Sequence, residues 1–111
     1  MPKKTESPPD LDTQSQEGVA VAEEREVKRP KRYKVLLHND DYTTMEFVLL
    51  VLKQIFRHSE ENAMAIMLKV HREGMGIAGL YTYEIAETKA SQTMQMARKE
   101  QFPLRCSLEA E

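Results

Sequence analysis

The chain has 111 residues and a formal net charge of −2. That length fits one small domain with a single modest core, and the charge balance argues against the broad positive field that nucleic acid binding usually needs. Its one cysteine, Cys106, excludes an intrachain disulfide and a clustered thiol site for zinc.

Residues 1–30 hold four of the five prolines and no aromatic residue. Such a segment cannot bury enough apolar surface to offset its chain entropy, so we predict a disordered arm. The arm ends in KRPKRYK at 28–34, with five basic side chains in seven residues. We interpret this stretch as a solvated junction, with a nucleic acid patch as the alternative. The folded domain is expected to span residues 31–111.

YKVLLH at 33–38 alternates as a strand does, with Val35 and Leu37 on one face. NDDY then favours a turn. Thr43 with Glu46 forms a capping box, which predicts a helix from about residue 44 to about residue 57. Its apolar residues are too many for one stripe, so we expect a central helix covered around most of its circumference.

Ser59 and two glutamates predict the start of a second helix, and Gly74 suits its end. Residues 76–83 then predict a strand, residues 84–99 a helix and residues 104–109 a half-buried strand. The order β-α-α-β-α-β indicates an α+β fold: a small two-layer domain whose three-stranded antiparallel sheet is covered by three helices. The longest apolar run, FVLLVL at 47–52, is too short to span a membrane, and we expect a cytoplasmic protein.

Asn39, Asp40 and Asp41 offer several oxygen acceptors and few donors, which suits a positively charged donor such as an ammonium group. Ordinary turn and cap chemistry is the alternative explanation. His71 on the second helix could face the same site, or could be a partly buried histidine satisfied by a backbone carbonyl. His38, just before the turn, is a second titratable group that could add pH sensitivity.

Apolar side chains near this turn could form the wall of a pocket: Met45, Val48, Met67 and Val70. Asp40 and His71 also suggest general base chemistry or a metal site. The chain, however, has no nucleophile motif, no second clustered histidine and no glycine-rich phosphate loop. We therefore predict a protein that is not an enzyme and needs no cofactor.

Four strings in the folded part resemble one family: NDDYTTMEFV at 39–48, MLKVHREG at 67–74, YTYEIAETK at 81–89 and FPLRCSLE at 102–109. They are similar, in the same order, to ClpS, the N-degron adaptor of the bacterial ClpAP protease. The resemblance covers residues 33–109. It implies an adaptor that binds proteins with N-terminal Leu, Phe, Tyr or Trp and performs no chemistry itself.

By this resemblance, Asn39, Asp40 and His71 bind the α-amino group of the substrate, while Asp41 holds the turn and adds negative potential. A side-chain pocket is implied at Leu37, Thr43, Met45, Val48, Met67, Val70 and Leu104. Met45 resembles the family's gate against β-branched first residues. Thr44 departs from the family, which usually has proline there, so a looser helix entry is expected with Thr43 still acting as cap.

The resemblance also implies that Glu84, Glu87 and Lys89 contact the N-terminal domain of the ClpA-type AAA+ unfoldase, and that the motor engages the arm. An ordinary charged helix start is the alternative for these three residues. We expect a monomer whose partners are the unfoldase and its substrates, without nucleic acid or membrane. The alternative function is a general peptide-binding module that recognises internal apolar segments and ignores the free amine.

Overall fold

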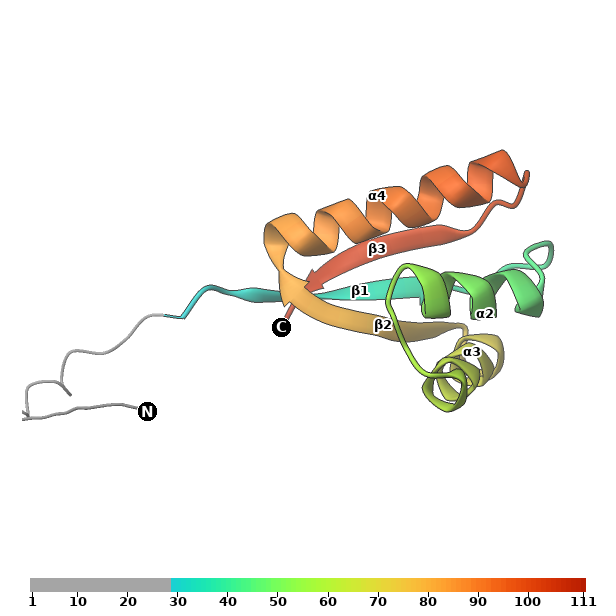
Figure 1. Ribbon diagram of the computed structural model, residues 1–111, viewed down its shortest axis with the longest axis horizontal. Helices are drawn as coiled ribbons and strands as arrows, with labels where there is room; N and C mark the ends of the chain where they lie inside the picture. The colour runs from blue at the N-terminus through green and yellow to red at the C-terminus, as the bar shows by residue number, and fades with distance from the viewer. Residues whose placement is uncertain (1–28) are drawn as a thin grey trace, which may run out of the picture.

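The computed structural model of the protein describes residues 29–111, which form one sheet and three helices (Figure 1). The predicted element order is confirmed, with these bounds: β1 Arg32–His38, α2 Met45–Gln54, α3 Glu60–Glu73, β2 Met75–Thr82, α4 Tyr83–Lys99 and β3 Arg105–Ala110. The predicted arm lies outside the described residues except for Arg29 and Pro30. Within residues 29–111, no helix has both the length and the apolar character to cross a membrane.

β1 is the central strand of the sheet. It pairs antiparallel with β2 on one side and with β3 on the other, which confirms the predicted three-stranded antiparallel sheet. Direct partners on neighbouring strands share a face of the sheet. One such row joins Leu37 to Gly76 and Cys106, and all three residues are buried. This face therefore forms the floor of the core.

A bulge interrupts the pairing of β1 with β2. Val35 pairs with Gly79 and Leu36 pairs with Ile77, so Ala78 is left without a direct partner in β1. The Ala78 carbonyl instead accepts a hydrogen bond of 2.6 Å from Nε2 of His58, in the connection between α2 and α3. The bulge thus ties that connection to the sheet.

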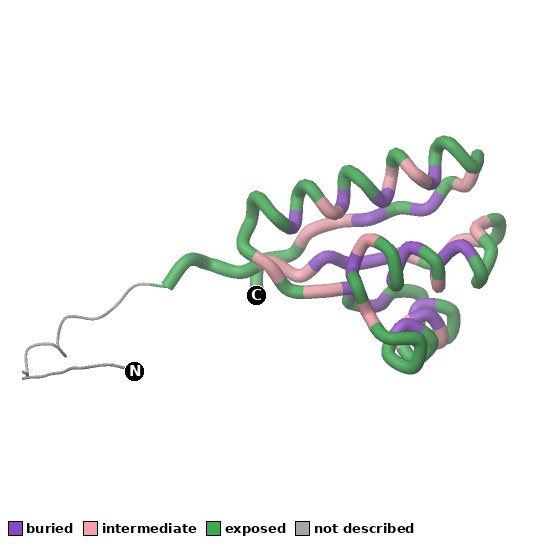
Figure 2. The backbone as a smooth tube through the Cα atoms, viewed as in Figure 1, coloured by how far each residue is buried: buried purple, intermediate pink, exposed green. Residues whose placement is uncertain are grey.

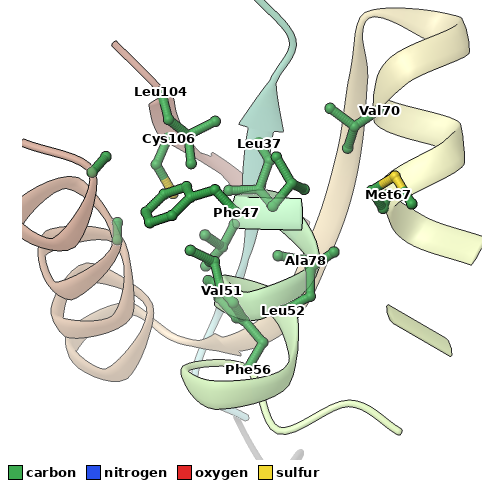
Figure 3. Packing of buried hydrophobic residues seen from close by; sticks show 14 of the residues in the cluster. Leu37, Phe47, Val51, Leu52, Phe56, Met67, Val70, Ala78, Leu104 and Cys106 are labelled. Carbon is green, nitrogen blue, oxygen red and sulfur yellow. The ribbon is translucent and has the colours of Figure 1, made fainter. Parts of the chain in front are cut away.

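The helices cover one face of the sheet. In Figure 3, Phe47, Val51 and Leu52 of α2 lie among Leu37 and Ala78 of the strands, with α3 and α4 on either side of α2. Figure 2 shows buried segments along β1 and on one side of each helix. The opposite face of the sheet is more open, since Met75, Ile77 and Leu80 are exposed. The two-layer prediction is confirmed.

α2 is buried along one stripe, which corrects the prediction that most of its circumference is covered. The buried residues are Phe47, Val48, Val51 and Leu52. Leu50 points away from them and is 39% exposed. The helix also ends at Gln54 rather than near Arg57, because Arg57 has a φ of 61°, a left-handed conformation through which an α-helix does not continue.

The predicted ends of α3 are confirmed. The Ser59 hydroxyl accepts a hydrogen bond from the Asn62 N–H at 3.2 Å, as an N-cap does. Gly74 adopts a φ of 88° at the C-cap and donates its N–H to the Val70 carbonyl. The observed ends of β1, β2, α4 and β3 differ from the predicted ends by at most one residue.

Lys89 joins α4 to the C-terminal end of α2. Its Nζ donates to the carbonyl of Ile55, the C-cap residue of α2, at 2.7 Å. It also lies 5.9 Å from the ring centroid of Phe56 and 5.4 Å from that of Tyr81. A cation at this position satisfies a carbonyl that has no partner within the helix and faces the negative end of the helix dipole. Lys89 therefore has a structural role in packing α2 against α4.

We expect Lys89→Met to lower the free energy of unfolding by about 1 to 2 kcal/mol, because it keeps an apolar side chain but leaves the Ile55 carbonyl unpaired and removes the cation from both rings. Urea unfolding would measure the change. Lys99→Met is the matched control, because Lys99 is exposed in the last turn of the same helix. An equal loss in both variants would contradict this role of Lys89.

Candidate functional site

A cavity of about 240 Å³ opens where β1 ends and where α2 and α3 approach each other. It is lined by Asn39, Asp40, Asp41, Thr43, Met45, Val48, Met67, Val70 and His71. All nine are residues that the sequence analysis assigned to the site. One side of the cavity is polar, from the turn and the histidine, and the other is apolar. Its volume suits one side chain better than a large ligand.

Asp40 holds the turn together. Its Oδ1 accepts the N–H groups of Tyr42 and Thr43 at 2.8 and 2.7 Å, and its Oδ2 accepts the Thr43 hydroxyl at 2.7 Å. Burial raises the pKa of this carboxyl, but the hydrogen bonds from Thr43 and Tyr42 outweigh it, and the net pKa lies below the ordinary 3.8. Asp40 is therefore ionised at neutral pH, and it has the turn-holding role that we expected of Asp41.

Asp41 and His71 are two open polar groups of the cavity. Both are exposed, and neither has a side-chain hydrogen bond or ion pair with another residue in 29–111. The alternative explanation for His71, a histidine satisfied by a backbone carbonyl, describes His58 instead. In the same part of the chain, no hydrogen bond joins Asp40 to His71, and no group of acidic, histidine or cysteine side chains is suited to hold a metal ion.

The apolar side of the cavity has a closed floor and an open mouth. Val48, Met67 and Val70 are 6%, 7% and 2% exposed, whereas Met45 is 46% exposed. Met45 is the first residue of α2, so its flexible side chain stands at the rim. Met45 therefore lies at the mouth of the cavity, above the buried floor.

Two backbone features bring the turn and α3 together. The Asn39 N–H donates to the Gly74 carbonyl at 2.9 Å, which joins the end of β1 to the end of α3. At Gly76 a Cβ would lie 2.7 Å from Cγ2 of Val70, so only glycine allows this approach of α3 to β2. Sequence reasoning missed Gly76, although a glycine at the start of a strand is a recognised signal of close backbone approach.

The N-cap of α2 is Thr44, and the prediction of Thr43 as cap was wrong. The Thr44 hydroxyl accepts from the Phe47 N–H at 3.1 Å, and its extended backbone, with φ −75° and ψ 154°, suits an N-cap. The Thr43 hydroxyl instead donates a hydrogen bond to the Asp40 carboxylate. The residue that replaces the usual proline therefore caps the helix itself.

Three residues near the site do not line the cavity. Leu37 and Leu104, 0% and 5% exposed, belong to the same core cluster as Val48, Met67 and Val70, so they can support its wall. His38 faces the other side of the sheet, where its Nε2 lies 2.6 Å from Oγ of Ser107. Burial and the nearby Arg105 charge lower the pKa of His38. That titration therefore takes place outside the cavity.

The start of α4 presents a second candidate surface. Glu84 and Glu87 are exposed, and the Tyr83 hydroxyl lies 3.4 Å from a carboxylate oxygen of Glu87. Lys89 is partly buried and bonded to Ile55, so its ammonium group is less available than the two carboxylates. Exposed apolar residues accompany the acids, since Tyr83 and Ile85 are 47% and 50% exposed.

A larger hollow of about 560 Å³ lies at the basic junction, at the opposite end of β1 from the cavity. It is lined by Arg29, Pro30, Lys31, Arg32, Thr82, Ala110 and Glu111. Arg32 makes two hydrogen bonds of 2.9 and 3.0 Å with the Glu111 carboxylate, which partly neutralises this surface. The hollow has no buried floor of large apolar side chains and no acidic turn like that of the cavity.

Comparison with known proteins gives consistent results. The model of the family described as "ATP-dependent Clp protease adaptor protein ClpS" matches residues 28–107. The chain is 56% identical over 95 residues to the ATP-dependent Clp protease adapter protein ClpS of Oleidesulfovibrio alaskensis, a match that covers 86% of this chain and 91% of the relative. It is 53% identical over 102 residues to the ClpS of Maricaulis maris, covering 90% and 94%.

A solved structure is also similar. Agrobacterium tumefaciens ClpS2 bound to L-phenylalaninamide superposes with a TM-score of 0.72 at 44% sequence identity. The match covers 75% of this chain and 100% of that chain.

Because the Asp40 carboxylate accepts hydrogen bonds from three donors, we expect Asp40→Asn to destabilise the fold by about 1 kcal/mol at neutral pH. The pKa of Asp40 is lowered in the folded state, so its contribution is present above pH 3.8 and is lost as the pH falls below that value. Urea unfolding at neutral pH and at about pH 3 would measure both effects. Asp41→Asn is the matched control. If it lowered the free energy of unfolding as much as Asp40→Asn does, the turn-holding role of Asp40 would be overturned.

Proposed function

The chain belongs to the ClpS family of Clp protease adaptors, which are substrate adaptors and not enzymes, and on this basis we propose that it binds proteins whose first residue is Leu, Phe, Tyr or Trp. It delivers these proteins to a ClpA-type unfoldase for degradation by the attached protease. The observation that supports this best is the cavity, in which an acidic turn and an open histidine adjoin an apolar floor.

The polar side of the cavity suits a protonated α-amino group. An ammonium group has three donors and no acceptor, and the turn supplies an amide oxygen and two carboxylates. In this assignment, Asn39, Asp40 and His71 accept from the amine. Asp41, which is exposed, adds negative potential that favours the charged form.

The apolar side suits the first side chain. L-Phenylalaninamide, the ligand of the similar Agrobacterium protein, combines a free amine, an aromatic side chain and an amide in place of the next peptide bond. That combination is the chemistry of a protein's first residue. The same two halves of the cavity support the same mode of binding here.

The expected affinity is moderate. Burying one large apolar side chain contributes about 1.5 to 3 kcal/mol, and each hydrogen bond to a charged group contributes roughly 1.5 to 3 kcal/mol. Association costs several kcal/mol, so we expect a dissociation constant on the order of micromolar. An adaptor that releases its substrate to a motor needs such reversible binding.

Delivery uses a different part of the molecule. Glu84 and Glu87, at the exposed start of α4, are the proposed contacts for the N-terminal domain of the unfoldase. The role of Lys89 in this contact is indirect, since its ammonium group is bonded to Ile55. We propose that the adaptor acts as a cytoplasmic monomer and that the motor engages the N-terminal arm.

A general peptide-binding module remains the alternative function. It would use the apolar floor for internal residues and would not need the free amine. The acidic lining of the cavity favours the first-residue receptor, because an internal apolar segment has no cation to place against Asp40 and Asp41.

Fluorescence anisotropy would test the role of the amine with a labelled peptide that begins with free Leu, its N-acetyl twin and a twin that begins with Ala. We expect binding to the first peptide and at least a tenfold loss for each of the others, about 1.4 kcal/mol or more. We expect three variants, Asn39→Ala, Asp40→Ala and His71→Ala, to weaken the binding of peptides that begin with Leu, Phe, Tyr or Trp to the same extent. Equal binding of the acetylated twin would favour the general module.

Met45 is proposed to set specificity from the rim of the cavity. We expect Met45→Ala to improve binding of peptides that begin with Ile or Val by roughly tenfold, about 1.4 kcal/mol, because it removes the side chain that crowds a branched Cβ. Binding of a Leu peptide should change less. Met64→Ala is the control, since Met64 is also a partly exposed methionine but does not line the cavity. A uniform loss of affinity for all ligands would contradict this role of Met45.

A further inference from the structure

We propose that the groove between α4 and β3 receives an extended segment of the unfoldase, which adds to the free edge of β3. This inference rests on the proposed function, because it names a further contact with the same partner. It is independent of the substrate cavity.

The groove is a hollow of about 340 Å³ with an apolar floor and a polar rim. Its lining is Glu87, Ala90, Ser91, Met94, Gln95, Arg98, Cys106, Ser107 and Leu108. The α4 residues recur every three or four positions, so one complete stripe of the helix faces the groove. The β3 residues are consecutive, so the backbone of the strand itself lines the other side.

β3 is an edge strand and offers backbone groups to a new neighbour. It pairs with β1 on one side only, and α4 lies beside it in Figure 1. An extended peptide in this position could pair with the strand by β-augmentation. The Ser107 hydroxyl already lies 2.6 Å from His38, so the strand backbone is what remains available at that residue.

β2, at the other edge of the sheet, suits such a partner less well. Its bulge displaces Ala78, and the Ala78 carbonyl is occupied by His58. Bulges of this kind interrupt edge-to-edge pairing. β3 pairs with β1 without a shift in register, so its edge is the more regular one.

The charges of the groove define what the segment should look like. Glu87 and Arg98 lie at its two ends, eleven residues apart on α4 or about 16 Å along the helix axis. An extended chain covers that distance in about five residues. The best occupant therefore has a basic residue near Glu87, an acidic residue about five positions away near Arg98, and a small or apolar side chain between them.

The groove also continues the surface proposed above for the unfoldase. Glu87 belongs to both, and Glu84 lies one turn before it on α4. A single partner could therefore contact the start of α4 and extend along β3. This continuity favours the unfoldase over the substrate as the occupant.

The test measures binding of the purified cognate Clp unfoldase to full-length adaptor variants. Ser91→Arg places a long cationic side chain in the groove, and Gln92→Arg adds the same charge one position around the helix, outside the groove. We expect Ser91→Arg and Arg98→Glu to weaken binding at least about tenfold, and Gln92→Arg to change it less than about threefold. Hydrogen exchange of the amides at 106–108 should slow when the unfoldase is added.

Two further measurements separate this inference from the proposed function. All variants should bind the free-Leu peptide as the parent does, which also reports that they are folded. If Glu84→Ala with Glu87→Ala abolishes unfoldase binding while Ser91→Arg and Arg98→Glu leave it unchanged, the groove is not used and the proposed function stands. An equal loss of unfoldase binding in Ser91→Arg and Gln92→Arg would also overturn the proposal that the groove is used. A parent protein that does not bind the unfoldase overturns both proposals.

Discussion

The close approach of α3 to β2 is the constraint on which the cavity depends. Gly76 allows it, because any larger side chain would meet Val70. Gly74 reverses the chain with a φ of 88°, and its carbonyl accepts the N–H of Asn39. Residues that are distant in the sequence are thereby brought into one small site. Without this approach, the acidic turn would remain a polar loop and His71 an exposed histidine at the end of a helix.

Much of the fold was predictable from the sequence, because hydrophobic periodicity and capping residues act locally. Ser59 caps the start of α3 and Gly74 caps its end, as expected. Two of the errors arose where two neighbouring residues offered the same chemistry. Thr43 and Thr44 can both cap a helix, and Asp40 and Asp41 can both hold a turn. The choice within each pair follows from the direction of the chain as it leaves β1, which no local pattern specifies.

The sequence identified most residues of the candidate site, but it did not show how each of them is used. Nine of the expected residues line one cavity, but Leu37 and Leu104 lie in the core, and Lys89 is bonded to Ile55. These distinctions depend on tertiary contacts. The cavity lies at the end of β1 and the start of α4 lies near its beginning, since His38 pairs with Met75 and Arg32 with Thr82. The seven residues of β1 separate them by about 20 Å, so a substrate and an unfoldase need not compete for one surface.

The central position of β1 has a mechanical consequence. The chain before Arg32 leads directly into β1, the strand of this sheet that is hydrogen-bonded on both sides. Tension applied to the preceding residues would pull β1 along its own length between two fixed neighbours. Both ladders would then be loaded in shear, so many hydrogen bonds must break together. A strand at the edge could be peeled away one bond at a time, and a domain pulled there would yield under a smaller force.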